Sequence, residues 1–232
     1  MDNNIIVKID ENEVLRYLGY KGQVIGEELL LKIRSTIEEG KKLIKPKIIY
    51  KEYDINNLGK GTEVVGTTLV LEGKDIKNLL KECNRCILMA ATIGNYIEKK
   101  IRFYEKIDLT RAVILDAVST TAVECLCDSV CTSIEDSLIK DNLELTFRYS
   151  PGYGDLSLNI QRDFINVLNG SREIGVNVSK HMLLFPRKSV TAIVGIRRKL
   201  GEKAKKSCIN CENYENCLYR KEENACGCTR IC

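Results

Sequence analysis

A short run of residues, Arg-Tyr-Ser-Pro-Gly-Tyr at positions 148–153, combines side chains and backbone suited to binding a small molecule. Arg148 carries a planar guanidinium that matches a carboxylate, and Tyr153 offers an aromatic ring and a hydroxyl. Pro151 fixes the backbone and donates no N–H, while Gly152 allows a tight turn and a close approach by a ligand. The run predicts either a ligand-binding loop or an ordinary Pro-Gly turn with a surface arginine, and spacing alone does not separate the two.

Six of the eleven cysteines lie after position 207 and form a second candidate site. A polar, charged stretch at 201–206 separates them from the preceding chain. A C-x-x-C pair followed by a third cysteine after five residues is typical of metal ligands, and a segment this short and polar needs a metal rather than an apolar core to order it. Zinc and an iron–sulfur cluster both fit, and a tail of reduced thiols is the alternative. The predicted ligands are Cys208, Cys211, Cys217, Cys226 and Cys228, with Cys232 as the sixth cysteine.

The remaining cysteines are predicted to be structural. Cys83 and Cys86 repeat the C-x-x-C spacing, but they straddle a junction between a predicted helix and a predicted strand, where buried thiols are expected. Cys125, Cys127 and Cys131 fall on a predicted helix and cannot all face one way, because residues two apart on a helix point about 200° apart. We interpret these five as core and partly buried residues.

Apolar periodicity along the chain predicts a mixture of helices and strands without a regular βαβ rhythm, so an α+β fold is favoured over a doubly wound sheet. Neither common type of Gly-rich phosphate loop is present. We expect residues 1–200 to form one domain and 201–232 an appended tail. Helices are expected at 10–18, 27–40, 75–83, 108–140 and 158–168, and strands at 47–53, 63–71, 86–93, 143–149, 174–178 and 189–196.

Composition excludes several classes of function. The chain has 232 residues, 44% of them hydrophobic, and a formal net charge of +4, which is too small to indicate nucleic-acid binding. The apolar run at 86–93 is far too short to cross a bilayer, and the first residues lack the pattern of a secretory signal. We therefore expect a cytoplasmic protein without a membrane or nucleic-acid partner, in which a disulfide framework is not expected.

Four segments taken together resemble the reactivation domain of cobalamin-dependent methionine synthase, in its free-standing form. They appear in consistent order over roughly residues 5 to 198. The 148–153 run matches the Arg-x-x-Pro-Gly-Tyr signature of that family. The other three segments are residues 9–10 with 17–22, the helix around Asp116 and Glu124, and residues 175–182 followed by Pro186, Ser189 and Val190.

The resemblance implies a C-shaped α+β domain with a twisted antiparallel sheet and flanking helices that binds S-adenosylmethionine in an extended groove. Such domains repair an oxidised corrinoid: a reductase such as flavodoxin supplies an electron, and the methyl group of S-adenosylmethionine traps the reduced cobalt. The chain is therefore expected to be a component of a split methionine synthase, a methyltransferase of methionine biosynthesis, whose cobalamin is held by a partner core subunit. The chemistry asks the protein mainly for positioning and for exclusion of water.

The resemblance also implies roles for individual residues on the 148–153 run. Arg148 would hold the carboxylate of S-adenosylmethionine. Backbone groups of Ser150, Pro151 and Gly152 would bind polar atoms of the adenine or ribose. Tyr153 would lie between the sulfonium and the corrinoid, where its ring face suits a cation.

Three acidic residues complete the implied site. Asp10 would accept from the ligand's amino group or ribose, although its position also predicts a helix N-cap. Asp116 would contact the histidine released from cobalt, with a solvated helix position as the alternative. Thr120 stands where the family has a glutamate, and Glu124, one turn further along, is expected to compensate.

Two neighbouring functions stay open at this point. One is reactivation of a different corrinoid methyltransferase, and the other is binding of S-adenosylmethionine as a sensor or adaptor without methyl transfer. A small metal-binding nucleic-acid module is disfavoured by the modest charge and by the lack of interleaved aromatic and basic residues in the tail.

Overall fold

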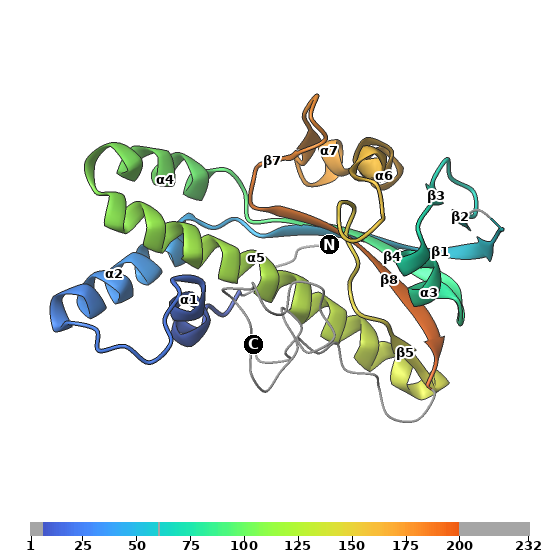
Figure 1. Cartoon of the computed structure of the whole chain (residues 1–232), viewed down its shortest axis with the longest axis horizontal. Coiled ribbons are helices and arrows are strands. Elements are labelled where there is room, and N and C mark those ends of the chain that lie inside the picture. The colour runs from blue at the N-terminus through green and yellow to red at the C-terminus, as the bar shows by residue number, and fades with distance from the viewer. Residues whose placement is uncertain (1–6, 60, 200–232) are drawn as a thin grey trace. The chain divides into compact units, whose positions relative to one another are not determined.

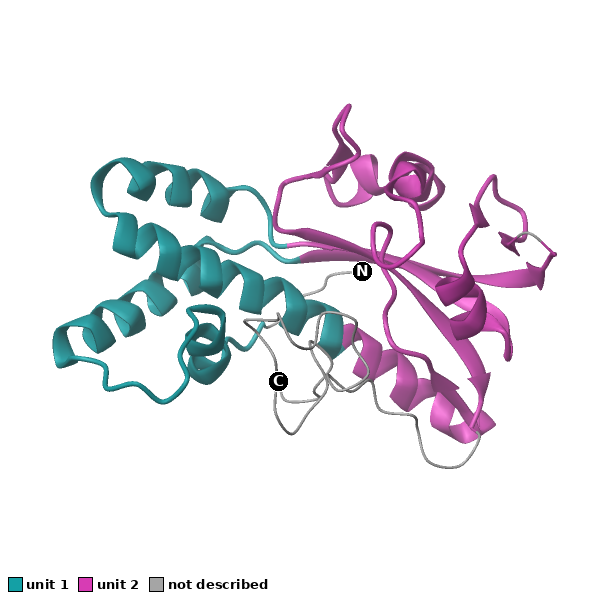
Figure 2. Ribbon diagram, viewed as in Figure 1, with its two compact units in different colours: residues 1–46, 93–129, 204–232 teal, residues 47–92, 130–203 magenta. Residues whose placement is uncertain are grey.

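The computed structural model describes residues 7–59 and 61–199 (Figure 1). The chain divides into two compact units (Figure 2). Unit 1 contains residues 7–46 and 93–129 of the described chain, and unit 2 contains 47–92, without residue 60, and 130–199. The long helix α5 (Leu109–Leu138) contributes its first part to unit 1 and its last turns to unit 2.

Unit 2 is built on a six-stranded antiparallel sheet with the strand order β3-β2-β1-β4-β8-β5. The central strands β4 and β8 are buried along most of their length and consist largely of β-branched and small apolar residues. A separate two-stranded sheet joins β6 and β7. The bounds are β1 Lys47–Asn57, β2 Thr62–Val64, β3 Val70–Leu71, β4 Cys83–Thr92, β5 Leu143–Leu145, β6 Asn177–Val178, β7 Leu184–Phe185 and β8 Ser189–Arg198.

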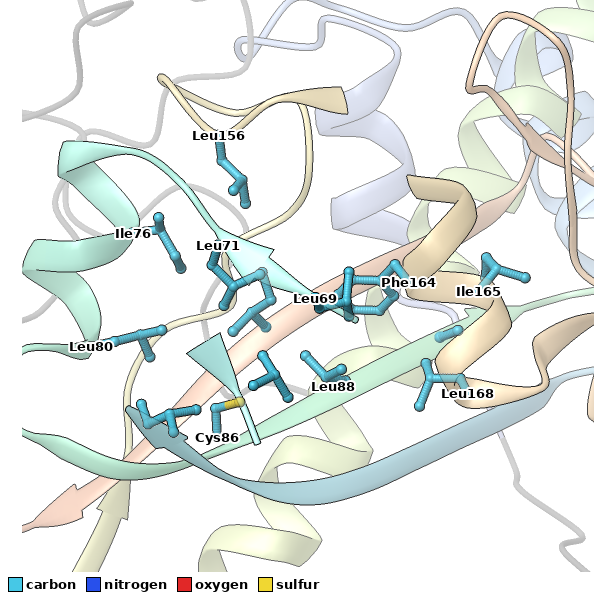
Figure 3. Packing of buried hydrophobic residues seen from close by; sticks show 14 of the residues in the cluster. Leu69, Leu71, Ile76, Leu80, Cys86, Leu88, Leu156, Phe164, Ile165 and Leu168 are labelled. Carbon is cyan, nitrogen blue, oxygen red and sulfur yellow. The ribbon is translucent and has the colours of Figure 1, made fainter. Parts of the chain in front are cut away.

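The main core of unit 2 lies on one face of this sheet (Figure 3). Leu88 and Cys86 of β4 point into it from the sheet, and Phe164 enters it from helix α6 (Gln161–Leu168). Helix α3 (Lys74–Leu80) adds Ile76 and Leu80. The same side carries the short helices η2 (Leu158–Ile160) and α7 (Gly170–Glu173) next to α6. On the opposite face, Met89 of β4 meets Cys131 in the part of α5 that belongs to unit 2, and the turn η1 (Ile139–Asp141) follows that helix.

Unit 1 is helical and contains α1 (Glu11–Tyr17), α2 (Glu27–Leu43), α4 (Tyr96–Ile107) and the first part of α5. Helix α4 buries Ile97, Ile101 and Tyr104, whose i, i+4 and i+7 spacing places them on one face. The Tyr104 hydroxyl donates to Glu39 of α2 at 2.7 Å, so a polar contact reinforces this apolar packing.

The predicted α+β class with an antiparallel sheet is confirmed, and so is the long helix expected from 108 to 140. Several boundaries were wrong. The strand expected at 63–71 is two short strands, because Gly66 adopts a positive φ and the chain turns back on itself there. The strand expected at 174–178 begins only at Asn177, and the one expected at 143–149 ends at Leu145. Helix α4 and strand β7 were not predicted.

Within the described residues, no helix has both the length and the apolar character that crossing a membrane requires. The cysteines proposed as metal ligands, Cys208, Cys211, Cys217, Cys226 and Cys228, lie outside the described residues, as does the 201–232 tail.

Candidate functional site

The predicted ligand-binding run begins where the chain leaves the edge strand β5. Thr146 continues the pairing with β8, because its N–H donates to the Gly195 carbonyl at 2.9 Å and its hydroxyl accepts from the Gly195 N–H at 2.8 Å. Tyr149 then forms an isolated bridge to Ile193, with hydrogen bonds of 2.9 and 2.8 Å. The segment that carries Arg148 is therefore fixed to the central sheet on both sides of that residue.

Residues 149–156 then form a compact loop, here called the 149–156 loop. The Gly152 N–H donates to the Leu156 carbonyl at 2.9 Å, and the Leu156 N–H donates to the Tyr153 carbonyl at 3.1 Å. The Tyr153 N–H donates to the Ser150 carbonyl at 3.1 Å. Pro151 is buried, and Leu156 is only 2% exposed within the core (Figure 3). The loop is thus closed by its own hydrogen bonds and anchored by apolar side chains.

The internal hydrogen bonds determine which backbone groups remain for a ligand. The Gly152 N–H and the Ser150 carbonyl, both expected to bind adenine or ribose atoms, are used within the loop. Among the described residues, the Ser150 N–H and the carbonyls of Pro151 and Gly152 have no hydrogen-bond partner. These three groups offer both a donor and acceptors, the combination that polar edges of a nucleoside require.

Two side chains give the loop its chemical character. Arg148 is half-buried at the base of the loop, and the Tyr153 side chain is 64% exposed at its tip. The guanidinium can bind a carboxylate in a bidentate manner, and the ring can cover a cation or stack on a planar group. This combination suits a ligand that has an acidic end and a cationic or aromatic centre.

The loop is also tied to helix α3. The Asp155 carboxylate accepts from the Lys74 N–H at 2.6 Å and from the Asp75 N–H at 3.2 Å. The Lys74 N–H is the main cause that holds the pKa of Asp155 below its ordinary value of 3.8. The Tyr149 hydroxyl lies 3.1 Å from the Tyr153 carbonyl and 3.3 Å from a carboxylate oxygen of Asp75. Asp75, Tyr149 and Asp155 were not among the predicted site residues.

The three predicted acidic residues belong to unit 1. Asp10 is the N-cap of α1, and its carboxylate accepts from the Asn12 N–H at 2.7 Å, as the alternative interpretation of this residue predicted. Asp116 and Glu124 are both half-buried on α5, two turns apart. Burial raises the pKa of Tyr17, and the charge of nearby Glu124 adds to that rise.

The predicted site residues therefore fall into two groups. The structure brings Arg148, Ser150, Pro151, Gly152 and Tyr153 together on a single segment of unit 2. Asp10, Asp116 and Glu124 lie on two helices of unit 1.

In the described part of the chain, no metal centre coincides with the predicted site. No group of three or more histidine, cysteine or acidic side chains in residues 7–59 and 61–199 is arranged to hold a metal ion. A cavity of about 250 Å³ in unit 2 contains none of the predicted site residues. Its lining consists of Tyr50, Glu52, Ile87, Ser133, Ile134, Ser137 and Leu138.

The fold and the loop together define an α+β protein with an antiparallel sheet and a hydrogen-bonded Arg-x-x-Pro-Gly-Tyr loop at the sheet edge. Among solved structures, the chain is similar to the MetH reactivation domain, whose crystal structure contains AdoHcy. The TM-score is 0.63 at 14% sequence identity, and the match covers 90% of this chain and 80% of that chain. No protein-family profile and no curated protein matches the sequence. The structural resemblance predicted from the sequence is thus confirmed at the level of the fold.

Proposed function

We propose that this chain binds S-adenosylmethionine at the 149–156 loop and supports reductive remethylation of a corrinoid held by another protein. The observation that carries the proposal is the hydrogen-bonded loop presenting Arg148 and Tyr153, on a fold shared with the MetH reactivation domain that was solved with AdoHcy. In this proposal Arg148 binds the carboxylate of the ligand, and the Ser150 N–H with the Pro151 and Gly152 carbonyls binds its nucleoside.

The reaction supported by this arrangement is a methyl transfer that asks for little acid–base chemistry. One electron from a reductase, flavodoxin-like or of another kind, reduces cobalt(II) to cobalt(I) in the corrinoid substrate. The cobalt electron pair then forms a bond to the methyl carbon, the carbon–sulfur bond breaks, and its electron pair remains on sulfur to give S-adenosylhomocysteine. The chain contributes orientation of the methyl donor, and Tyr153 covers the sulfonium. Asp10, Asp116 and Glu124 keep the roles predicted above.

Partner and compartment follow from the same proposal. We infer that the corrinoid is held by a methionine synthase core subunit in the cytoplasm, so that the chain is an accessory component of a split enzyme. An assay of methyl transfer tests this directly: cobalt(II) corrinoid protein, a reductant and methyl-labelled S-adenosylmethionine are mixed with the chain. Label on the corrinoid supports the proposal, and transfer only to a different corrinoid methyltransferase identifies that enzyme as the partner. Tight binding without any transfer leaves the adaptor function.

The role of Arg148 has a sharper test in calorimetry. Loss of a charge-assisted pair in Arg148→Ala should weaken binding of S-adenosylmethionine by about 2–3 kcal/mol, which is roughly 30- to 150-fold. Binding of 5′-methylthioadenosine, which has no carboxylate, should change little in the same variant. Arg172→Ala, which removes an exposed arginine on α7 of the same unit, serves as the matched control. Equal losses for both ligands would remove Arg148 from the carboxylate site.

The cysteine-rich tail is proposed to hold zinc or an iron–sulfur cluster, on the basis of its ligand spacing. Protein purified without oxygen should contain either about one zinc per chain or iron and sulfide with visible absorption. If the protein contains no zinc, iron or sulfide, the tail carries reduced thiols only.

A further inference from the structure

The 149–156 loop must keep its shape while it exposes polar groups and an aromatic ring to a ligand. Fixing the backbone of each residue opposes folding by about 1–2 kcal/mol, so an exposed loop needs contacts that define it. Its start is fixed by the Tyr149–Ile193 bridge, and its end is fixed by buried Leu156. The tip, residues 153–155, lies between these two anchors and is exposed.

Asp155 ties this tip to a helix that begins 81 residues earlier in the chain. The first N–H groups of any helix lack partners within the helix. Helix α3 has Gly73 at its N-cap position, which supplies no capping side chain. Asp155 provides the missing acceptor, because its two carboxylate oxygens accept from the N–H groups of Lys74 and Asp75. The Asp155 carboxylate therefore caps the N-terminus of α3 and at the same time connects the loop to that helix.

The Tyr149 hydroxyl is a second contact between the loop and helix α3. It lies within hydrogen-bond distance of the Tyr153 carbonyl and of Asp75. Gly154 fits between these groups only because it has no Cβ: a Cβ there would overlap both the Tyr149 hydroxyl and the Asp75 carboxylate. Its φ of +50° also lies in the left-handed region that disfavours other residues.

We propose that Asp75, Tyr149 and Asp155, here called the Asp155 clamp, are positioning residues that hold the 149–156 loop in the shape that binds its ligand. This inference rests on the proposed function for the identity of that ligand. The clamp fixes the Tyr153 carbonyl, and through it the turn that carries Ser150 and Gly152. Holding a loop in its bound conformation before the ligand arrives reduces the entropy lost on binding, so removal of the clamp lowers affinity without removing a ligand contact.

The test compares Asp155→Ala and Asp155→Asn with Asp108→Ala. Asp108 is a matched control, because its carboxylate caps α5 by accepting from the Arg111 N–H at 3.1 Å and has no predicted role in binding. AdoHcy is the probe in calorimetry, and amide hydrogen exchange of Gly152 and Leu156 reports the loop itself. Asp155→Ala should weaken AdoHcy binding about tenfold and accelerate exchange of both amides. Asp155→Asn should lose less AdoHcy affinity than Asp155→Ala, because the amide oxygen of asparagine still accepts one of the two hydrogen bonds. Asp108→Ala should lower the melting temperature and leave AdoHcy affinity unchanged.

The outcomes separate the two proposals. AdoHcy affinity and loop exchange in Asp155→Ala equal to those of the parent protein would refute the clamp. If the parent protein does not bind AdoHcy, the proposed function fails, and the clamp is then supported or refuted by the exchange of Gly152 and Leu156 alone. Should Asp155→Ala fail to fold, Tyr149→Phe, which removes a single hydroxyl, takes its place: a severalfold loss of affinity with faster loop exchange supports the clamp, and parental values overturn it.

Discussion

Gly195 of β8 offers the most direct test of how the sheet supports the candidate site. It pairs with Cys86 of β4 on one side and with Thr146 on the other, two residues before Arg148. A Cβ at position 195 would lie 2.5 Å from the Cys83 sulfur and 2.8 Å from a Leu80 methyl group. Overpacking of this kind destabilises a core by about 1–3 kcal/mol, while replacing glycine with alanine recovers about 0.4–1 kcal/mol through the unfolded chain. We therefore expect Gly195→Ala to lower the free energy of unfolding by about 1–2 kcal/mol.

A double-mutant cycle identifies the sulfur as the source of this cost. Cys83→Ala removes one buried heavy atom and should destabilise the chain by about 1 kcal/mol by itself. In the double variant the methyl group introduced at position 195 occupies the space that the sulfur leaves. The loss in the free energy of unfolding should therefore be smaller, by about 1 kcal/mol, than the sum of the losses in the two single variants. Urea unfolding followed by far-ultraviolet circular dichroism measures all four proteins, and tyrosine fluorescence gives a second probe because the chain has no tryptophan. Additive losses would contradict the packing around Gly195 described here.

Three further outcomes are expected. Burial raises the pKa of Cys83 to about 11 and that of Cys86 to about 12, so neither thiol should react with iodoacetamide at pH 8 in the folded protein, and both should react in urea. The pKa of Asp155 is lowered below 3.8, so the clamp is intact at neutral pH and is lost as the pH falls through that lowered value; loop amide exchange, corrected for its intrinsic pH dependence, should rise only there. Tyr153→Ala should reduce the rate of methyl transfer more than the affinity for S-adenosylmethionine, as judged by labelled transfer and calorimetry on the same samples.

The elements with strong apolar patterns could be predicted from the sequence. Strand β4 and helix α5 carry long runs of apolar residues bounded by polar ones, and both were found close to their expected bounds. The wrong strand boundaries occurred where the chain turns without a change in composition. Gly66 divides one predicted strand into two, and Ile174 and Val176 pack into the core from irregular backbone rather than from a strand. Burial alone does not reveal hydrogen-bond pairing, which depends on neighbours distant in sequence.

Cys83 and Cys86 of β4 also show that local spacing does not reveal how a strand pairs. A three-residue separation in a regular strand places two side chains on opposite faces of the sheet. The pairing register shifts between Cys83 and Arg85, and the irregularity brings Cys83 and Cys86 into the same core. Their burial was predicted correctly, but the irregularity that allows it has no signal in the C-x-x-C spacing.

The candidate site divides along similar lines. Arg148, Pro151, Gly152 and Tyr153 belong to one short run, so a single motif was enough to place them on one loop. The contact between Asp155 and helix α3 joins residues about 80 positions apart, and only the fold brings them together. Gly154-Asp155 follows the motif directly, which is the one local signal that could have drawn attention to it.

The loop's internal bonding has a consequence for selectivity. Pro151 has no N–H and the Gly152 N–H is donated within the loop, so residues 150–152 offer a ligand one N–H, that of Ser150, and the carbonyls of Pro151 and Gly152. A turn with a single donor cannot neutralise an anion by its backbone, unlike a phosphate-binding loop, which relies on successive N–H groups. In the proposed function, the charge of an acidic ligand is therefore assigned to Arg148 rather than to the backbone of the turn. The motif alone therefore does not define the proposed site: in our proposal the arginine provides the positive charge, and Gly154 with the Asp155 clamp holds the loop that presents the carbonyls.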